Sequence, residues 1–170
     1  MNLIICFTLM IFNISTDDGI LNMAKEKLVK YKVSNNRYVV IIDYSKSIDD
    51  ERLYLVDINK NKIILKSTVS HGVNSGGKYA TKFSNTDGSL QSSLGGYKTG
   101  SIYNGKYGRS LVLEGLDGSI NSNARSRYIV FHSNKKMSTK WSWGCFATPD
   151  NINDKLINII KDGCLVYVHN

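Results

Sequence analysis

The chain has 170 residues, which fits one domain with a buried core and at most a short extension. Its 42% hydrophobic and 21% charged residues exclude a disordered chain, and 14 Gly with one Pro argue against coiled coils and proline-rich linkers. Three Cys exclude a disulfide-dense scaffold. Lys and Arg outnumber Asp and Glu by 22 to 14, a net charge of +8. Such a charge favours an anionic partner, whether nucleic acid, acidic lipid or cell-wall polymer.

The N-terminal segment, residues 2–14, is uncharged and mostly apolar. It is too short to span a bilayer as a helix, and it matches the apolar region of a secretory signal peptide. A basic n-region and a clear cleavage site are missing. We predict a signal peptide or N-terminal anchor at residues 1–16, with a buried N-terminal element as the alternative. Its removal would take away Cys6 and no charged side chain.

Next in the chain comes a lysine-rich extension, residues 17–37, in which the pattern of residues 22–33 predicts a short helix. Strand patterns then follow. They are predicted at residues 38–43, 52–57, 63–70, 110–113, 128–132 and 165–169, with a polar turn at 57–62 that makes the second and third a hairpin.

Two segments interrupt this series of strands. Residues 71–109 are rich in Gly, Ser, Asn and Tyr, which indicates irregular structure or short strands around a site. Residues 150–161 have helical spacing, with Pro149 at the start and Gly163 as the stop. Many short strands with one clear helix predict a mainly β fold, a sandwich or barrel with a helix packed on it.

The sharpest local motif is Ser142-Trp143-Gly144-Cys145. A Gly before Cys lets the backbone bend so that the thiol and nearby amides face one point, where they can meet an oxyanion. A Cys nucleophile needs a base, and His132, at the end of an apolar strand thirteen residues upstream, is the candidate. The alternatives are a buried, inert Cys145 and, in an exported protein, a Cys145–Cys164 disulfide.

The spacing of this motif and His132-Ser133, followed by a helix and a closing strand, resembles the catalytic region of L,D-transpeptidases, the YkuD-like family. Upstream blocks resemble its murein L,D-transpeptidase branch. These blocks include His71-Gly72-Val73-Asn74-Ser75-Gly76, Phe83-Ser84-Asn85, Ser92-Ser93-Leu94-Gly95, Gly108-x-Ser110-Leu111 and Asn121-x-Asn123-Ala124-x-x-Arg127. The resemblance covers roughly residues 38–169, and it implies a catalytic domain over 38–170 with a β-sandwich of mixed sheets and a helix near the C-terminus.

The resemblance also implies roles for individual residues. Cys145 would be the nucleophile, His132 its base, and the Ser133 carbonyl the group that orients the imidazole. The amides of Trp143, Gly144 and Cys145 would form the oxyanion hole. Substrate-binding residues would be His71, Arg127, Ser142 and Trp143, with structural roles as the alternative for His71 and Arg127.

One departure from the family concerns position 147, where many members carry Arg and this chain has Ala147. The anionic end of the substrate would then be met elsewhere, by Arg125 or Arg127. The loop between His132 and Cys145 is also shorter than expected for this branch.

The implied activity is peptidoglycan L,D-transpeptidation. A thioester would form on a tetrapeptide stem, D-Ala would leave, and a 3→3 cross-link would result. The alternatives are an L,D-carboxypeptidase, in which water resolves the thioester, and a catalytically inactive wall-binding domain. The expected location is the periplasm or cell envelope, with membrane association if the N-terminal segment is retained. No cofactor is expected, no metal site because His71, His132 and His169 lack ligand-like spacing, and no nucleic-acid partner because the basic residues are dispersed.

Overall fold

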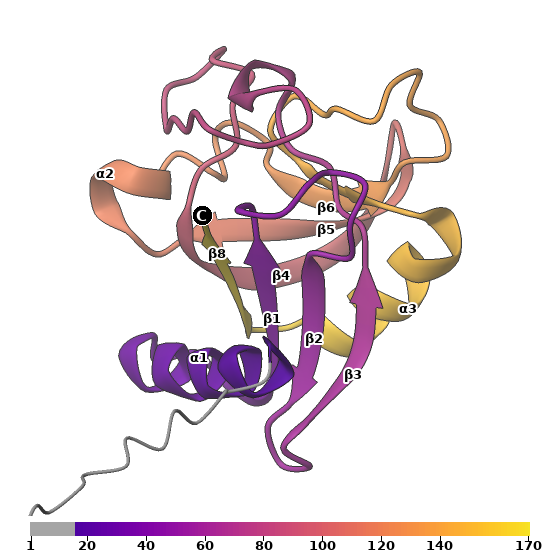
Figure 1. Ribbon diagram of the computed structural model, residues 1–170. Coiled ribbons are helices and arrows are strands. Elements are labelled where there is room, and N and C mark those ends of the chain that lie inside the picture. Colours follow the sequence, from indigo (N-terminus) through magenta and orange to yellow (C-terminus); the bar gives the residue numbers. More distant parts are fainter. Residues whose placement is uncertain (1–15) are drawn as a thin grey trace, which may run out of the picture.

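A computed structural model describes residues 16–170, so residues 1–15 of the predicted signal peptide lie outside the described part. The elements in chain order are α1 (Thr16–Lys30), β1 (Asn35–Asp43), β2 (Leu53–Asp57), β3 (Lys62–Ser67), a 3-10 turn (Val73–Ser75), β4 (Gly95–Gly105), β5 (Gly108–Gly115), α2 (Gly118–Asn121), β6 (Val130–Ser133), β7 (Phe146–Thr148), α3 (Asp150–Ile160) and β8 (Cys164–His169). Figure 1 shows their arrangement.

All eight strands belong to one mixed sheet, in the order β3-β2-β1-β8-β4-β5-β6-β7. The pairs β1·β8 and β6·β7 are parallel, and the other neighbours are antiparallel. The sheet curls, so that β5 and β6 cross above the end of the β1–β2–β3 half (Figure 1). The predicted mainly β fold with a helix near the C-terminus is confirmed. The two layers of the expected sandwich are parts of one continuous, hydrogen-bonded sheet.

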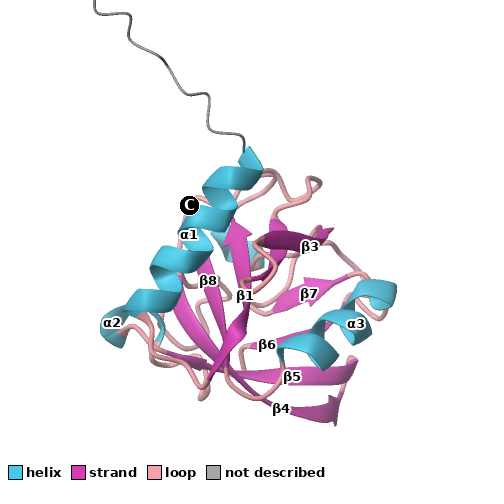
Figure 2. Cartoon of the chain, turned by 90° about the horizontal axis from the view of Figure 1, so that it is seen from below, coloured by secondary structure: helices cyan, strands magenta, loops and turns pink. Residues whose placement is uncertain are grey.

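Strand β1 explains why its sequence is an unbroken apolar run. Val39 and Ile41 face α1, where they join a cluster with Ala24, whereas Val40 and Ile42 face the main core on the other side of the sheet. Successive side chains of a strand point to opposite faces, so a strand covered on both sides needs apolar residues at every position. Figure 2 shows α1 and α3 on different sides of the strands.

The two longer helices were both expected from the sequence. The N-terminal helix begins at Thr16 and ends at Lys30, whereas the pattern predicted residues 22–33. Two acidic residues in its first turn and two lysines in its last turn complement the helix dipole, which supports the earlier start. Helix α3 matches its prediction within one residue. Among residues 16–170, no helix has the length and apolar character needed to cross a membrane.

Strand β4 is the main departure from the expected elements. It lies within the segment predicted as irregular or short-stranded, yet at 11 residues it is the longest strand described. Its sequence holds four glycines and no apolar run. The strand forms because β5 and β8 pair with its two edges, a tertiary effect that local pattern does not reveal.

Candidate active site

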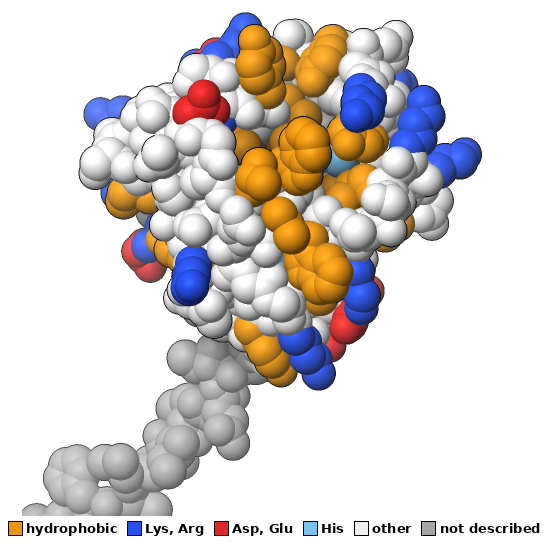
Figure 3. Space-filling view, turned by 90° about the horizontal axis from the view of Figure 1, so that it is seen from above, with side chains coloured by type: hydrophobic (Ala, Val, Ile, Leu, Met, Phe, Trp, Pro, Cys, Tyr) orange, Lys and Arg blue, Asp and Glu red, His pale blue; other side chains and the backbone are white. Residues whose placement is uncertain are grey.

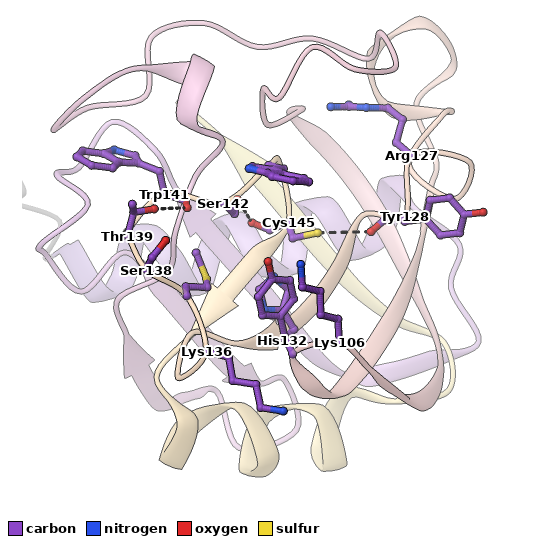
Figure 4. A pocket seen from close by; sticks show the side chains of 13 residues that line it. Lys106, Arg127, Tyr128, His132, Lys136, Ser138, Thr139, Trp141, Ser142 and Cys145 are labelled. Atoms are coloured by element: carbon purple, nitrogen blue, oxygen red, sulfur yellow. Dashed lines mark hydrogen bonds between the residues drawn. The ribbon is translucent and has the colours of Figure 1, made fainter.

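Strands β6 and β7 bring the candidate base and nucleophile to one face of the sheet. They pair in parallel, with Phe131 opposite Phe146 and His132 opposite Ala147. The two Phe rings pack in the core, with their ring centroids 5.3 Å apart. Because side chains alternate, His132 and Ala147 point away from that core, and so does Cys145, two residues before Ala147. Figure 4 shows His132 and Cys145 facing the same pocket.

The turn before Cys145 depends on Gly144. Its φ is +116°, a conformation that L side chains rarely adopt. A Cβ at this position would lie 2.8 Å from the Gln91 carbonyl oxygen, so the turn also packs closely on a neighbouring loop. The Gly144 N–H donates to Ser142 Oγ at 3.0 Å, and Ser142 Oγ donates to the Cys145 carbonyl at 2.7 Å. Ser142 therefore holds the shape of the turn from inside.

A second buried serine also fixes this turn. Ser70 Oγ donates to the Cys145 carbonyl at 3.2 Å and accepts the Ala147 N–H at 2.9 Å. The adjoining segment is tied down as well, since the Ser142 N–H donates to the His71 carbonyl at 2.9 Å. Ser142, Trp143 and Cys145 line the pocket, and residues 69–93 support them from behind. We call residues 142–145 and 69–93 together the fixed wall.

His132 is buried, and one of its ring nitrogens already has a hydrogen-bond partner. Its Nδ1 lies 2.8 Å from the Ser133 carbonyl oxygen, which can only accept, so Nδ1 carries the proton and the Nε2 lone pair remains available to take a proton. The Tyr107 ring stacks on the imidazole, with ring centroids 4.6 Å apart and an interplanar angle of 19°. Burial lowers the pKa of His132 below its usual 6.5, so the imidazole is neutral at neutral pH.

The Cys145 thiol donates to the Tyr128 carbonyl at 3.4 Å (Figure 4). Tyr128 itself has a φ of +56°, rare for a residue with a side chain, two residues before the start of the strand that carries His132. Burial raises the pKa of Cys145 above its usual 9, although the positive charge of Arg127 partly opposes this effect. At neutral pH the resting site therefore holds a thiol and a neutral imidazole.

Both side chains open into a pocket of about 570 Å³. Besides them it is lined by Lys106, Tyr107, Arg127, Tyr128, Lys136, Met137, Ser138, Thr139, Trp141, Ser142 and Trp143. Figure 3 shows hydrophobic side chains forming a band across this end of the molecule, with Lys and Arg gathered along one rim. Residues 105–108 and 134–141, which we call the open wall, face the fixed wall across the pocket. The cavity therefore suits a ligand with apolar parts and negative charge.

His71 does not line this pocket. It is fully buried, its Nδ1 lies 2.9 Å from an Arg52 guanidinium nitrogen, and its Nε2 lies 3.1 Å from the Gly76 carbonyl. Since Arg52 can only donate, His71 Nδ1 accepts and Nε2–H donates to Gly76. Arg52 is also fully buried and donates twice to the Val69 carbonyl. This position favours the alternative of a structural histidine, in the part of the fixed wall that does not line the pocket.

Arg127 lines the pocket, but its guanidinium is already engaged. One terminal nitrogen donates to the Ser84 carbonyl and to Ser93 Oγ, at 2.7 and 2.9 Å. The other donates to the Gln91 carbonyl and to Ser89 Oγ, at 2.7 and 3.2 Å. Arg127 thus fastens the loop against which Gly144 packs, and this geometry favours the structural alternative for it.

The remaining residues singled out in the sequence are all placed. Trp143 is 71% exposed on the pocket rim, and Trp141 lines the pocket while its Nε1–H donates to the Gly77 carbonyl at 2.9 Å. Arg125 lines a separate apolar hollow and lies 3.7 Å from Glu114. Cys145 and Cys164 are both free thiols, so the alternative of a disulfide between them is wrong.

Sequence reasoning missed three residues that shape the site, namely Tyr107, Tyr128 and Ser70. Tyr107 had a usable signal, since Gly105 and Gly108 bracket it as a hairpin turn would. The other two act through a backbone carbonyl and a long-range hydroxyl contact, and neither has a local signature.

The fold is one curled mixed sheet, and it places a cysteine and a histidine in one pocket. The L,D-transpeptidase catalytic domain family (YkuD_2) matches residues 15–169, and the chain belongs to this family. No curated protein sequence matches the chain.

Solved structures are similar to this chain in fold. The helical cell shape determining protein Pgp2 from Campylobacter jejuni has 14% identity and a TM-score of 0.57, over 88% of this chain and 54% of that one. Bd1075 from Bdellovibrio bacteriovorus has 17% identity and a TM-score of 0.51, over 78% of this chain and 48% of that one. An L,D-transpeptidase from Xylanimonas cellulosilytica has 15% identity and a TM-score of 0.48, over 78% of this chain and 60% of that one. The chain thus spans about half the length of the first two structures.

Proposed function

We propose that this protein is a peptidoglycan L,D-transpeptidase in which Cys145 is the nucleophile and His132 the general base. The observation that carries the proposal is the β6·β7 pairing, which puts both side chains in one pocket. The Ser133 carbonyl leaves Nε2 of the imidazole as the proton acceptor. Membership of the L,D-transpeptidase catalytic domain family supports the substrate class.

In the first half-reaction, His132 Nε2 takes the proton from the Cys145 thiol, and the sulfur attacks the carbonyl carbon of the third residue of a tetrapeptide stem. The carbonyl electrons move to oxygen and form an oxyanion. When that oxyanion collapses, the bond to D-Ala breaks, and the departing amine takes the proton from His132. A thioester on Cys145 remains, and D-Ala leaves with its nitrogen protonated.

In the second half-reaction, the side-chain amine of another stem attacks the thioester. His132 accepts the proton that this amine loses, the C–S bond breaks, and the proton returns to sulfur. The product is a 3→3 cross-link with the enzyme restored. A neutral imidazole at the start of each half is required, and the lowered pKa of His132 provides it.

The oxyanion would be stabilised by backbone amides of the nucleophile turn. The Gly144 N–H is already bound to Ser142 Oγ, so the proposal assigns this role first to the amides of Trp143 and Cys145. The role of Gly144 is then to give the turn the φ that aims those amides at the pocket.

Stem peptides lie outside the cytoplasmic membrane, so we place the protein in the periplasm or cell envelope. The apolar residues 2–14 would direct its export, and the net charge of +8 suits a polymer that carries carboxylates.

Mass spectrometry of the intact protein mixed with defined muropeptides tests the mechanism. We expect a tripeptide thioester on the wild type, followed by cross-linked dimers. Cys145→Ala and His132→Ala should each abolish turnover and leave the fold intact by circular dichroism. Cys164→Ala is the matched control, because it removes the buried thiol of β8, far from the chemistry, and it should retain turnover. Wild-type rates from Cys145→Ala would refute the mechanism.

The products separate transfer from hydrolysis. Accumulation of tripeptide without any dimer would reject the transferase and leave an L,D-carboxypeptidase. No adduct and no turnover in the wild type would reject both and leave a binding domain.

A further inference from the structure

The charge of the pocket lining points to the kind of group that the pocket binds. Three cations, Lys106, Arg127 and Lys136, lie among its thirteen lining residues, and none of those thirteen is an Asp or Glu. A cavity whose ionisable lining is of one sign favours a ligand of the opposite charge. The ligand should therefore bring an anionic group close to Cys145.

The proposed function fixes where that group would lie. In a tetrapeptide donor the residue that leaves carries the C-terminal carboxylate, one residue beyond the carbonyl that Cys145 attacks. One residue of extended chain spans about 3.5 Å. A cation that recognises this carboxylate must consequently reach into the same pocket as the thiol.

Arg127 and Arg125 are both poorly suited to this role, for different reasons. Both terminal nitrogens of Arg127 donate to the loop of the fixed wall, so binding a substrate would cost those hydrogen bonds. Arg125 lines the neighbouring apolar hollow rather than this pocket.

Of the two lysines, Lys106 has the better orientation. Figure 4 shows the Lys106 side chain running into the pocket toward Cys145, whereas the ammonium of Lys136 points away from it. Lys106 lies in the β4–β5 turn, and the next residue, Tyr107, stacks on His132, which fixes the turn beside the base. Nearby lysines of the open wall are paired with carboxylates, Lys135 with Asp150 and Lys140 with Asp49, while the Lys106 ammonium lies 5.5 Å from the Tyr107 ring centroid.

We propose that Lys106 is a specificity-determining residue that binds the C-terminal carboxylate of the donor peptide and so selects donors that end in a free carboxylate one residue past the attacked carbonyl. This inference rests on the proposed function. Lys106 would supply the cation for the anionic end of the substrate. It lies at a different place from position 147, where many members of the family carry Arg and this chain has Ala147.

The test compares two donors, a tetrapeptide stem with a free C-terminal carboxylate and the same peptide as its C-terminal amide. The readout is kcat/KM for release of D-Ala or D-alaninamide. We expect the wild type to prefer the acid by about 10- to 100-fold, the usual range for a hydrogen bond to a charged group. In Lys106→Gln the rate with the acid should fall to that with the amide, while the rate with the amide stays nearly the same.

Two further variants make the test specific. Lys106→Arg keeps the charge and should keep the preference. Lys136→Gln removes the same charge from the same pocket rim and should also keep the preference. A Lys106→Gln enzyme that still prefers the acid as strongly as the wild type would overturn the proposal, and so would loss of the preference in Lys136→Gln alone.

Binding separates this inference from the proposed reaction. Calorimetry of Cys145→Ala with the two peptides requires no chemistry. Tighter binding of the acid that disappears in Cys145→Ala/Lys106→Gln would support Lys106 even if the wild type formed no thioester, a result that would refute the reaction alone. Equal binding of acid and amide by Cys145→Ala, together with equal turnover of both by the wild type, would refute Lys106 and leave the reaction standing.

Discussion

The two walls of the pocket are built in opposite ways. The fixed wall holds its shape through buried contacts, with Ser70 and Ser142 on the Cys145 carbonyl and Arg52 on His71 behind them. The open wall consists of exposed turns, and its ion pairs, such as Lys140 with Asp49, lie at the surface. Buried hydrogen bonds are costly to leave unmade, whereas surface ion pairs contribute little.

This difference matches what each wall has to do. A nucleophile must be held within a fraction of an ångström of its working position, which requires a rigid support. Side chains that meet a substrate can lie on exposed turns, where they adapt to it. We therefore expect substitutions in the fixed wall to affect turnover and stability strongly, and substitutions in the open wall to tune specificity and pH response.

Apart from loss of Cys145 or His132 themselves, the largest effect is expected for Gly144→Ala. The added Cβ would lie 2.8 Å from the Gln91 carbonyl, in a backbone with φ of +116°, so the turn must shift. Moving an oxyanion donor out of place typically costs about 100- to 1,000-fold in kcat. Steady-state turnover of muropeptides measures it. Gly77→Ala is the control, since a Cβ there meets nothing within 4 Å. Equal rates for the two variants would show that the turn is not rigid.

The next effect concerns the loop that Arg127 fastens. Arg127→Met removes four hydrogen bonds to residues 84–93, so the free energy of unfolding should fall by about 2–4 kcal/mol. Arg125→Met loses one exposed ion pair and should change it by less than about 0.5 kcal/mol. Urea denaturation of both variants makes the comparison. Similar values would contradict the anchoring role of Arg127.

Acid should weaken the fold through its buried histidines. Burial is the main cause that lowers the pKa values of His71 and His132 below 6.5. The unfolded chain then binds more protons than the folded one as pH falls below about 6.5, so stability is lost there, by at most about 1.4 kcal/mol per pH unit for each histidine.

Denaturation at pH 7.5, 6.0 and 5.0 measures how the free energy of unfolding changes with pH. His132→Phe keeps a ring beside Tyr107 and should make this pH dependence weaker. A wild-type protein that gains stability on acidification between these values would contradict the pKa directions.

The smallest effect is expected for Tyr107 in the open wall. Tyr107→Ala exposes the His132 ring to water, which weakens the desolvation that lowers its pKa. As the proposed base, His132 works only when neutral, so the acid limb of kcat/KM should move to higher pH, toward 6.5. A stacked aromatic pair contributes about 0.5–1.5 kcal/mol, which corresponds to a shift of at most about one pH unit.

Tyr107→Phe keeps the stacking and should keep the wild-type pH profile. A limb that moves to lower pH in Tyr107→Ala would contradict the shielding role of this ring.

Much of the fold was predictable because it follows local pattern. The buried run of β1, the hairpin of β2 and β3 and the spacing of α3 all appear in the sequence, since strand alternation, turn residues and helical periodicity are local properties. Strand β4 was not predictable in this way. Its glycines carry no apolar signal, and its hydrogen bonds come from strands that are distant in the sequence.

The same division holds in the site. His132 and Cys145 could be singled out because their residue types and spacing suit a thiol nucleophile and its base. Ser70 and the Tyr128 carbonyl could not, because each acts through a contact across the fold. Arg127 shows the reverse case. Its residue type indicated a substrate contact, whereas in the structure its guanidinium donates to backbone carbonyls of the loop that it holds in place.

By itself, the sequence determined the net charge of +8, the family resemblance and the candidate pair of a thiol and an imidazole. Those properties depend on residue types and on short spacings along the chain. Tertiary structure decided which cations remain available to a ligand, which ring nitrogen of His132 is available and in which direction each pKa moves. Burial and hydrogen-bond partners set all three, and they exist only once distant segments of the chain have packed together.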